Sequence, residues 1–320
     1  MKILVTYDMF YEGFAELKEK YEVTFPEGRD FSYEEVLEMI SGYDVLCSMF
    51  TFPVDKALID RAPNLRLIAN FGVGYNNIDI AYAIEKNITV TNTPDAVTAA
   101  TANLALGLML DVARRISECD RTWRVMGQEM KRGLLENLGV PVSGQVLGII
   151  GMGRIGKALA KRANALGMEV IYHNRRRRCI EEESKLNVLY VSKEELLEKS
   201  DFISLNAPYT TETYHIIAEE DLRRMKSSAI LINTARGPLV DEHALVRALK
   251  EGLILGAGLD VFEFDDMPLP ELMKMNNVVL TPHIGTQTIQ TRLDMARAVC
   301  DNVIGFIEGN RPMSRVLFRP

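Results

Sequence analysis

The sequence predicts an α/β protein with two doubly wound domains, each built on a parallel sheet that helices cover on both faces. Short β-rich segments alternate with helical patterns from the first residues onward, and a second series of this kind begins at Val146. Such alternation is typical of parallel sheets with crossover helices. A chain of 320 residues with 47% hydrophobic residues also exceeds what one core usually organises.

The elements can be placed in order along the chain. The first series predicts strands at residues 2–7, 44–48, 67–70 and 88–91, with a helix at 13–21. The second series predicts strands at 146–150, 169–172, 188–191, 202–205, 229–233, 255–259 and 278–280. A helical pattern with a face of small residues spans 95–115 and joins the two series. Another spans 288–308 and ends before Gly309, a suitable helix C-cap.

The charge balance disfavours a nucleic acid or an anionic membrane surface as a partner. The formal net charge is −7 and the pI is near 5.4, whereas phosphate backbones require an extended basic surface. The basic run from Arg175 to Arg178 is local. No apolar run approaches the roughly 20 residues that span a bilayer. We expect neither nucleic acid nor membrane among the partners.

The cysteines and the first residues predict a cytoplasmic protein. Residues 1–8 lead directly into a strand-like stretch and lack the pattern of a signal peptide. The cysteines are scattered without the spacing of a metal site or a disulfide framework, which fits reduced thiols. We expect no bound metal. The cysteines are Cys47, Cys119, Cys179 and Cys300.

A glycine-rich turn follows the first strand of the second series. Gly151 allows a tight turn, Gly153 lets the backbone approach a pyrophosphate, and Gly156 lets the next helix pack closely on the strand. With Arg154 and Ile155 between them, these residues open a helix whose free N–H groups attract phosphate. Such a turn can be purely structural, but strand, turn, helix and second strand follow in order here. We expect a bound dinucleotide.

The end of the second strand of this unit bears on which dinucleotide is bound. Folds that bind NAD usually place Asp or Glu there to hold the ribose 2′-hydroxyl. Asn174 stands at this position, 18 residues after Gly156 (174 − 156), and Arg175 and Arg176 follow it. A neutral residue does not repel a 2′-phosphate, and a guanidinium can hold one through two hydrogen bonds. The sequence favours NADP, with NAD as the alternative. A solvated surface loop without a ligand is the simpler hypothesis for the arginines.

Several motifs along nearly the whole chain resemble those of D-isomer-specific 2-hydroxyacid dehydrogenases. They are FGVGYNNID at 71–79, GMGRIG at 151–156, INTARG at 232–237, GAGLDVF at 256–262 and TPHIG at 281–285. The segments YHNR at 172–175 and KSSA at 226–229 are most similar to the branch of glyoxylate, hydroxypyruvate and 2-ketogluconate reductases.

The resemblance implies a specific division of the chain. A flavodoxin-like substrate domain would comprise residues 1–98 and 289–320, and a Rossmann cofactor domain residues 99–288. The substrate would bind in the cleft between the domains. The resemblance also implies a homodimer, formed through the helices around residues 99–115.

Two residues at strand ends are candidates for catalysis. Arg236 follows the strand at 229–233, and its planar fork of donors suits the carboxylate and the ketone oxygen of a 2-keto acid. His283 follows the strand at 278–280, and a histidine, with a pKa near neutrality, can give a proton to the ketone oxygen as hydride arrives. A structural ion pair and a structural histidine are the alternatives.

The acid that normally holds the catalytic histidine departs from the family pattern. The family usually has Glu-Pro five and six residues after the aspartate of its motif, and this chain has Asp265 and Asp266 there. An Asp side chain is one methylene shorter. We expect Asp265 to contact His283, with Glu263 as the alternative.

The remaining candidates follow from the resemblance. Val73 and Gly74 would offer N–H groups to the substrate carboxylate. Asp260 would accept a hydrogen bond from the nicotinamide carboxamide, and Phe50, Phe52 and Tyr75 would line the substrate pocket unless they serve packing. The other residues expected at the cofactor are Thr101, Pro208, Thr234, Ala235 and Gly285.

Together these features predict an oxidoreductase that transfers hydride between NAD(P)H and a small 2-keto acid to give a D-2-hydroxy acid. The alternative from another class is a dinucleotide-sensing interaction protein, similar to corepressors of this fold, with vestigial activity. The change at Asp265 favours that alternative, whereas Arg236 and His283 speak against it. A formate-type dehydrogenase would not need a proton donor to a ketone. The sequence does not identify the 2-keto acid.

Overall fold

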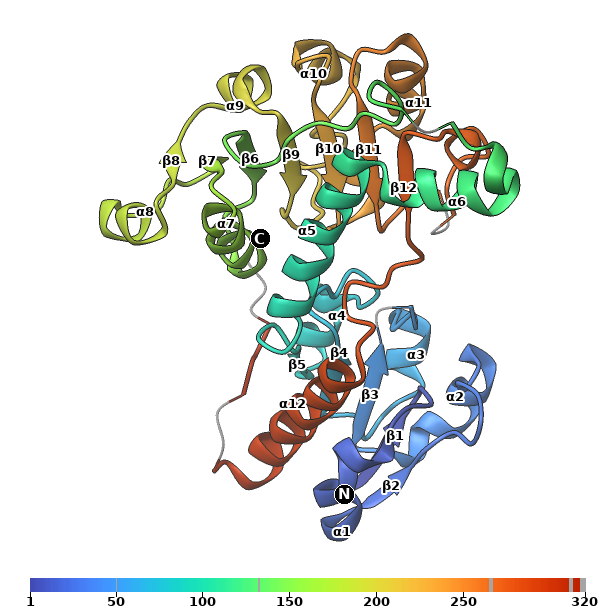
Figure 1. The fold of residues 1–320 in the computed structure, drawn as a ribbon. Coiled ribbons are helices and arrows are strands. Elements are labelled where there is room, and N and C mark those ends of the chain that lie inside the picture. Colours follow the sequence, from blue (N-terminus) through green and yellow to red (C-terminus); the bar gives the residue numbers. More distant parts are fainter. Residues whose placement is uncertain (50, 132, 265–266, 311–312, 317–320) are drawn as a thin grey trace. The chain divides into compact units, whose positions relative to one another are not determined.

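The computed structural model describes residues 1–49, 51–131, 133–264, 267–310 and 313–316. The chain divides into two compact units, which Figure 1 shows in ribbon form. Unit 1 comprises Met1–Val97 and Thr286–Pro320, and unit 2 comprises Thr98–Gly285.

Unit 1 contains a five-stranded parallel sheet with the order β2-β1-β3-β4-β5. Side chains alternate between two cores, because successive residues of a strand point to opposite faces. Ile3 and Val5 of β1 face α1 and α12, whereas Leu4 faces the core under α2, α3 and α4. The strands are β1 (Lys2–Val5), β2 (Glu22–Thr24), β3 (Val45–Met49), β4 (Leu67–Phe71) and β5 (Thr89–Thr91).

The helices of unit 1 have clear local signals at their ends. Ser32 caps α2 in a reciprocal capping box with Glu35, and Thr288 caps α12, which ends at Gly309 with φ +70°. The helices are α1 (Ala15–Lys20), α2 (Tyr33–Met39), α3 (Lys56–Asp60), α4 (Ile80–Glu85) and α12 (Ile289–Glu308), with 3₁₀ turns at Tyr11–Phe14 and Ile40–Gly42.

Unit 2 contains a seven-stranded parallel sheet with the order β12-β11-β10-β9-β6-β7-β8. The order reverses beside β6, which pairs with both β9 and β7, so the carboxyl end of β6 is a topological switch point. The strands are β6 (Val146–Ile150), β7 (Glu169–His173), β8 (Leu189–Tyr190), β9 (Phe202–Leu205), β10 (Ile230–Asn233), β11 (Gly256–Leu259) and β12 (Val278–Leu280).

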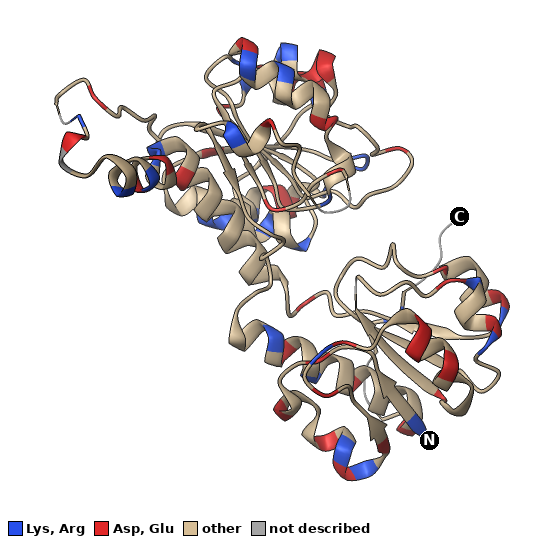
Figure 2. Cartoon of the chain, turned by 90° about the vertical axis from the view of Figure 1, so that its right-hand side faces the viewer, with Lys and Arg blue, Asp and Glu red and all other residues tan. Residues whose placement is uncertain are grey.

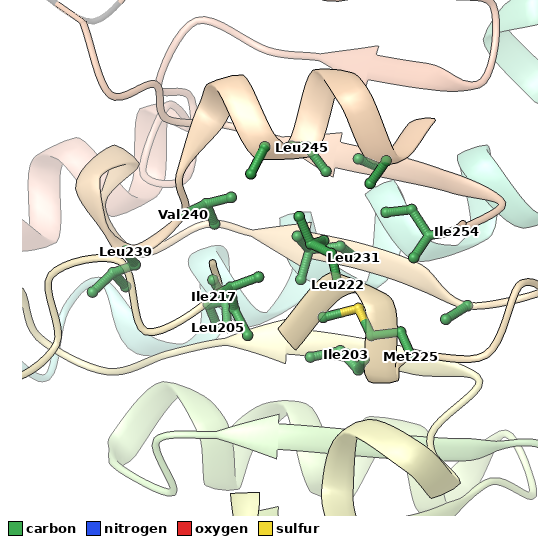
Figure 3. Packing of buried hydrophobic residues seen from close by; sticks show 14 of the residues in the cluster. Ile203, Leu205, Ile217, Leu222, Met225, Leu231, Leu239, Val240, Leu245 and Ile254 are labelled. Atoms are coloured by element: carbon green, nitrogen blue, oxygen red, sulfur yellow. The ribbon is translucent and has the colours of Figure 1, made fainter. Parts of the chain in front are cut away.

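Helices cover both faces of this sheet. Figure 3 shows Ile203, Leu205 and Leu231 packed against side chains of α10 and α11, whereas α5 and α7 pack on the opposite face. The helices are α5 (Thr98–Arg114), α6 (Ile116–Met126), α7 (Arg154–Ala165), α8 (Ile180–Leu186), α9 (Lys193–Lys199), α10 (Glu219–Arg224) and α11 (Glu242–Glu251). Further 3₁₀ turns are Gly127–Glu129, Gly237–Leu239 and Leu272–Lys274.

The predicted fold class is confirmed, since both units are parallel α/β structures. The sequence patterns did not reveal β2, α2, α3 and α4, which are short elements of seven residues or fewer. Such elements are stabilised by packing on the sheet more than by their own periodicity.

Charged side chains of both signs are interspersed along the outer helices, as Figure 2 shows. Among the described residues, no helix combines the length and the apolar character that a membrane crossing requires.

Candidate active site

The glycine-rich turn joins β6 to α7 at the switch point of the unit 2 sheet. Gly151 has φ +101°, and a Cβ there would lie 2.5 Å from the backbone of Asn206 and Ala207. A Cβ at Gly156 would lie 2.4 Å from the Gly151 oxygen, so this glycine lets α7 pack against the turn. At Gly153, the N-cap of α7, a Cβ would meet open space. The turn therefore forms a cradle whose approach side is free of side-chain bulk.

Polar side chains after β7 hold this turn in place. Asn174 Oδ1 accepts a hydrogen bond from the Met152 N–H at 2.7 Å. The Arg178 guanidinium donates to the Met152 carbonyl oxygen through Nε at 3.1 Å and Nη2 at 2.8 Å. Because Asn174 uses its oxygen for the turn, its amide nitrogen is the group left to serve as a donor to a ligand.

The four arginines after Asn174 differ in their surroundings. Arg177 donates to both Glu183 oxygens, and Arg178 holds the turn. Arg175 and Arg176 are exposed, and Arg175 lies 4.0 Å from Glu212 in a weak ion pair. Of the four, Arg175 and Arg176 have their guanidinium groups most open to a ligand.

Two orphaned polar atoms lie at the neighbouring strand ends. Asn206 Oδ1, after β9, and Thr234 Oγ1, after β10, are buried and have no hydrogen-bond partner among the described residues. Buried polar atoms are normally satisfied, so an unpaired one marks a place for a ligand or water. Together with the glycine cradle, these atoms fit a bound dinucleotide. Pro208 is exposed in the segment after β9, and Ala235 is half-buried beside Arg236.

Arg236 lies in a turn that Asn233 shapes. Asn233 is 1% exposed at the end of β10, and its side chain donates to the Arg236 carbonyl oxygen at 2.8 Å and accepts from the Ala235 N–H at 3.0 Å. Arg236 is half-buried. The turn presents the guanidinium at the carboxyl edge of the sheet, where parallel α/β sheets bind ligands.

His283 lies in a turn that Asp260 holds from the neighbouring strand. Asp260 is 1% exposed after β11, and its carboxylate accepts hydrogen bonds from Thr281 Oγ1 at 2.6 Å, Ile284 N at 2.7 Å and Gly285 N at 2.9 Å. Burial raises the pKa of Asp260, and these hydrogen bonds oppose the rise. His283 itself has φ +53°, an uncommon conformation for a non-glycine residue.

Thr101, on the first turn of α5, lies close to this turn. Its Oγ1 donates to the Gly285 oxygen at 3.5 Å, a long hydrogen bond. The structure thus brings Thr101, Asp260, His283 and Gly285 together at one turn.

The expected acid, Asp265, lies outside the described residues, as does Asp266. The alternative, Glu263, is described and has other partners. Its Oε1 lies 2.5 Å from His215 Nε2, and its Oε2 accepts from the Glu242 N–H at 3.1 Å. The carboxylate of Glu263 is therefore engaged by His215, in the segment between β9 and α10, and by the first residue of α11.

In unit 1, Val73 and Gly74 follow β4 in a turn whose carbonyl groups are fixed. Asn92 donates to the Val73 oxygen at 2.9 Å, and Asn70 donates to the Gly74 oxygen at 2.7 Å. Within the part of the chain that the structure describes, the N–H groups of Val73 and Gly74 donate to no residue. The N–H groups of Val73 and Gly74 are therefore held in place and available to a ligand.

Of the aromatic residues expected near the substrate, Phe52 is 6% exposed and belongs to the core under α2 to α4. It packs against Tyr33, with ring centroids 6.1 Å apart. Tyr75 is 40% exposed, and Phe50 lies outside the described residues. Phe52 therefore packs in this core, which was the alternative to lining the substrate pocket.

The sequence did not reveal the residues that hold the two turns and the loop before α11. Arg178 and the group formed by His215, Glu242 and Glu263 are joined across long stretches of chain, so no spacing indicates them. For Asn233 the sequence does contain an indication, because an Asn at the end of a strand is typical of a side chain that closes a turn.

The fold, the glycine cradle at the switch point and the polar turns at neighbouring strand ends define a dinucleotide-binding α/β protein. Residues 106–285 match the family model for the D-isomer specific 2-hydroxyacid dehydrogenase, NAD binding domain. A glyoxylate reductase of Thermococcus litoralis is 50% identical over 284 residues, covering 88% of this chain and 86% of that protein.

Two solved structures have the same fold over nearly their whole lengths. A glyoxylate reductase from Paecilomyes thermophila has a TM-score of 0.89 and 36% identity, covering 99% of this chain and 98% of that one. An NADPH-dependent glyoxylate/hydroxypyruvate reductase from Sinorhizobium meliloti, in complex with NADP and malonate, has a TM-score of 0.85 and 30% identity, covering 100% and 98%.

The chain therefore belongs to the D-isomer-specific 2-hydroxyacid dehydrogenase family, in its glyoxylate reductase branch. It is an enzyme that binds a nicotinamide dinucleotide and transfers hydride between NAD(P)H and a small 2-keto acid. The alternative of a dinucleotide-sensing interaction protein is not favoured.

Proposed function

We propose that this enzyme reduces glyoxylate and hydroxypyruvate with NADPH, with Arg236 and His283 as its catalytic residues. The observation that carries the proposal is the pair of polar turns at the ends of β10 and β12. Both strands are hydrogen-bonded to β11 in parallel, so the turn held by Asn233 and the turn held by Asp260 open at the same edge of the sheet.

The roles follow from the chemistry of each group. Arg236 binds the carboxylate and polarises the ketone oxygen, because a planar guanidinium can donate two parallel hydrogen bonds. His283, protonated, gives its proton to the ketone oxygen as C2 receives hydride, so that C=O becomes CH–OH and the imidazole is left neutral. The reduced nicotinamide, when bound, supplies the hydride. Val73 and Gly74 donate their N–H groups to the substrate carboxylate.

The NADPH preference rests on the residues after β7. Asn174 carries no negative charge, and its oxygen is already used by Met152. Arg175 and Arg176 are exposed beside it and can bind a 2′-phosphate. Asp260 and Thr101 are proposed to contact the nicotinamide carboxamide. The relatives named above act on glyoxylate or hydroxypyruvate, which supports these two small 2-keto acids as substrates.

Asp265 is proposed to orient His283 and to keep its proton available. The described geometry favours Asp265 over Glu263 for this role, because the Glu263 carboxylate is held by His215 and by the Glu242 N–H.

We further propose a cytoplasmic homodimer. Among the described residues the cysteines form no disulfide, which fits a reducing compartment. α5 buries its apolar face within unit 2, whereas α6 has no buried residue. Two hollows, of about 390 and 580 Å³, lie beside Leu138–Val140, close to this helix. The α6 patch, as defined here, consists of the exposed Ile116, Trp123, Val125, Met126, Leu134, Leu135 and Leu138. We propose that a second copy of the chain binds over the α6 patch.

The test is the initial rate of oxidation of NADPH and NADH with glyoxylate, hydroxypyruvate, pyruvate and 2-ketogluconate. We expect turnover of glyoxylate and hydroxypyruvate with NADPH preferred. The variant His283→Ala should lower kcat by about 10²–10⁴-fold and leave the Kd for NADPH nearly unchanged. The control is His243→Ala, which removes an exposed histidine of α11.

Two results would contradict these proposals. Binding of NADPH without turnover of any of the four 2-keto acids would refute the proposed substrates. An equal loss of NADPH affinity and kcat in His283→Ala would refute the role of His283 as the proton donor.

A further inference from the structure

Two acids outside the reacting groups join the first residue of α11 to the segment after β11. Glu242, the first residue of α11, is 3% exposed. Its Oε2 accepts from the Glu263 N–H at 2.8 Å and its Oε1 accepts from the Leu269 N–H at 2.7 Å. In return, the Glu242 N–H donates to Glu263 Oε2 at 3.1 Å. Glu242 and Glu263 therefore clamp each other through backbone and carboxylate together.

His215 attaches a third segment to this clamp. Its Nε2 lies 2.5 Å from Glu263 Oε1. The backbone N–H of His215 donates to the Pro238 carbonyl oxygen at 2.9 Å. His215 has φ +50°, an uncommon conformation for a non-glycine residue that persists only where the surroundings enforce it. The ring also stacks on Tyr214, with centroids 3.9 Å apart.

The clamped segment is the surface on which the Arg236 turn rests. A Cβ at Gly237 would lie 1.7 Å from the Phe262 oxygen and 2.5 Å from the Glu263 nitrogen, so the backbone there is in direct contact. Any displacement of Phe262 and Glu263 therefore shifts Gly237, and with it the adjacent Arg236. His215 contacts both sides of this junction, through Pro238 and through Glu263.

We propose that His215 is a positioning residue for the reduction. By holding Glu263, it fixes the Phe262–Glu263 backbone against Gly237 and thereby aims the Arg236 guanidinium at the 2-keto acid. The proposal rests on the role of Arg236 in the proposed function. It explains why a strained histidine, a buried carboxylate and a half-buried one occur beside a turn that they do not themselves form.

The test compares His215→Ala with His215→Gln in the full-length enzyme. Both variants carry the same backbone cost at φ +50°, because neither side chain favours the left-handed region. Only Gln keeps an N–H donor near the position of Nε2. In the Ala variant we expect kcat to fall and KM for glyoxylate to rise, each roughly tenfold, as for a modest misplacement of a binding group. In the Gln variant both should return to within about threefold of wild type.

A second measurement separates positioning from stability and from the proposed function. The Kd of oxalate, which resembles the substrate but cannot be reduced, is measured by calorimetry on the NADPH complex. It should rise roughly tenfold in His215→Ala, while the Kd of NADPH and the values for His243→Ala stay at the wild-type level.

Three outcomes overturn the proposal. A His215→Ala enzyme with a lowered Tm but wild-type kcat, KM and oxalate Kd well below that Tm would reduce His215 to a purely structural residue, leaving the proposed function intact. An unrescued loss in His215→Gln would show that the Glu263 bond is not the cause. Failure of the wild-type enzyme to reduce any 2-keto acid would refute the proposed function and this inference together.

Discussion

At the residue scale, we expect a single substitution at Asn174 to change the preference between NADPH and NADH. Its oxygen holds the Met152 N–H at 2.7 Å. Asp at this position would keep that bond and would add a negative charge where the ribose 2′ position is expected. That charge would accept a hydrogen bond from a 2′-hydroxyl and repel a 2′-phosphate.

Asn174→Asp should raise the KM for NADPH about tenfold, which is ~1.4 kcal/mol, and lower the KM for NADH. Steady-state kinetics with both cofactors measures the change. Asn187→Asp makes the same substitution at the exposed C-cap of α8 and is the control. Unaltered preference in Asn174→Asp would show that Asn174 does not face the 2′ position.

At the scale of elements, Glu183 of α8 is held by Tyr172 of β7 and by Arg177, which follows β7. The stability that these contacts provide depends on pH. Glu183 of α8 accepts from Arg177 Nη2 at 2.7 Å and from Tyr172 Oη at 2.6 Å. The hydrogen bonds from Arg177 and Tyr172 lower the pKa of Glu183 to about 2. Because the pKa is lower in the folded state than the roughly 4.3 of an unfolded chain, folding is stabilised by the ionised form. That stabilisation is present above about pH 4.3 and is lost as the pH falls toward 2.

Glu183→Gln should therefore lower the Tm at pH 7 by about 3 °C, and the gap to wild type should narrow as the pH falls below about 4.3. Circular dichroism melts at a series of pH values measure this gap. Glu198→Gln, at an exposed position of α9, is the matched control. A gap that stays constant or widens on acidification would disprove the assignment.

At the scale of the whole molecule, the α6 patch determines the expected assembly. Val125 is 86% exposed, and Leu134 and Leu135 are 97% and 84% exposed. A group of large apolar side chains left this exposed is typical of an interaction surface. A second copy of the chain would remove these side chains from water.

We expect a wild-type particle of twice the 36.0 kDa chain mass in sedimentation equilibrium. The double variant Val125→Glu, Leu135→Glu should sediment as a monomer, because two carboxylates would be buried without partners. Ile84→Glu, which charges an exposed apolar position of α4 in unit 1, should leave the dimer intact. A wild-type monomer would rule out the homodimer.

Local patterns in the sequence were sufficient to predict the fold class, several strands and the glycine-rich turn of this protein. Strand periodicity placed β6, β9 and β12 at their observed residues, and the glycine spacing identified the turn before α7. The physical reason is that a tight turn, a helix cap and a buried strand each depend on a few consecutive residues. The motifs around Arg236 and His283 are local in the same way, so the candidate catalytic pair was visible in the chain.

The tertiary structure alone decided which groups meet across long stretches of chain. His215 and Glu263 are 48 residues apart, and Asp260 holds a turn 21 to 25 residues further on. These pairs meet because the parallel sheet brings the carboxyl ends of successive strands to one edge. Hydrogen-bond partners and burial likewise depend on neighbours that sequence spacing does not specify, as the contacts of Glu263 and the burial of Phe52 show.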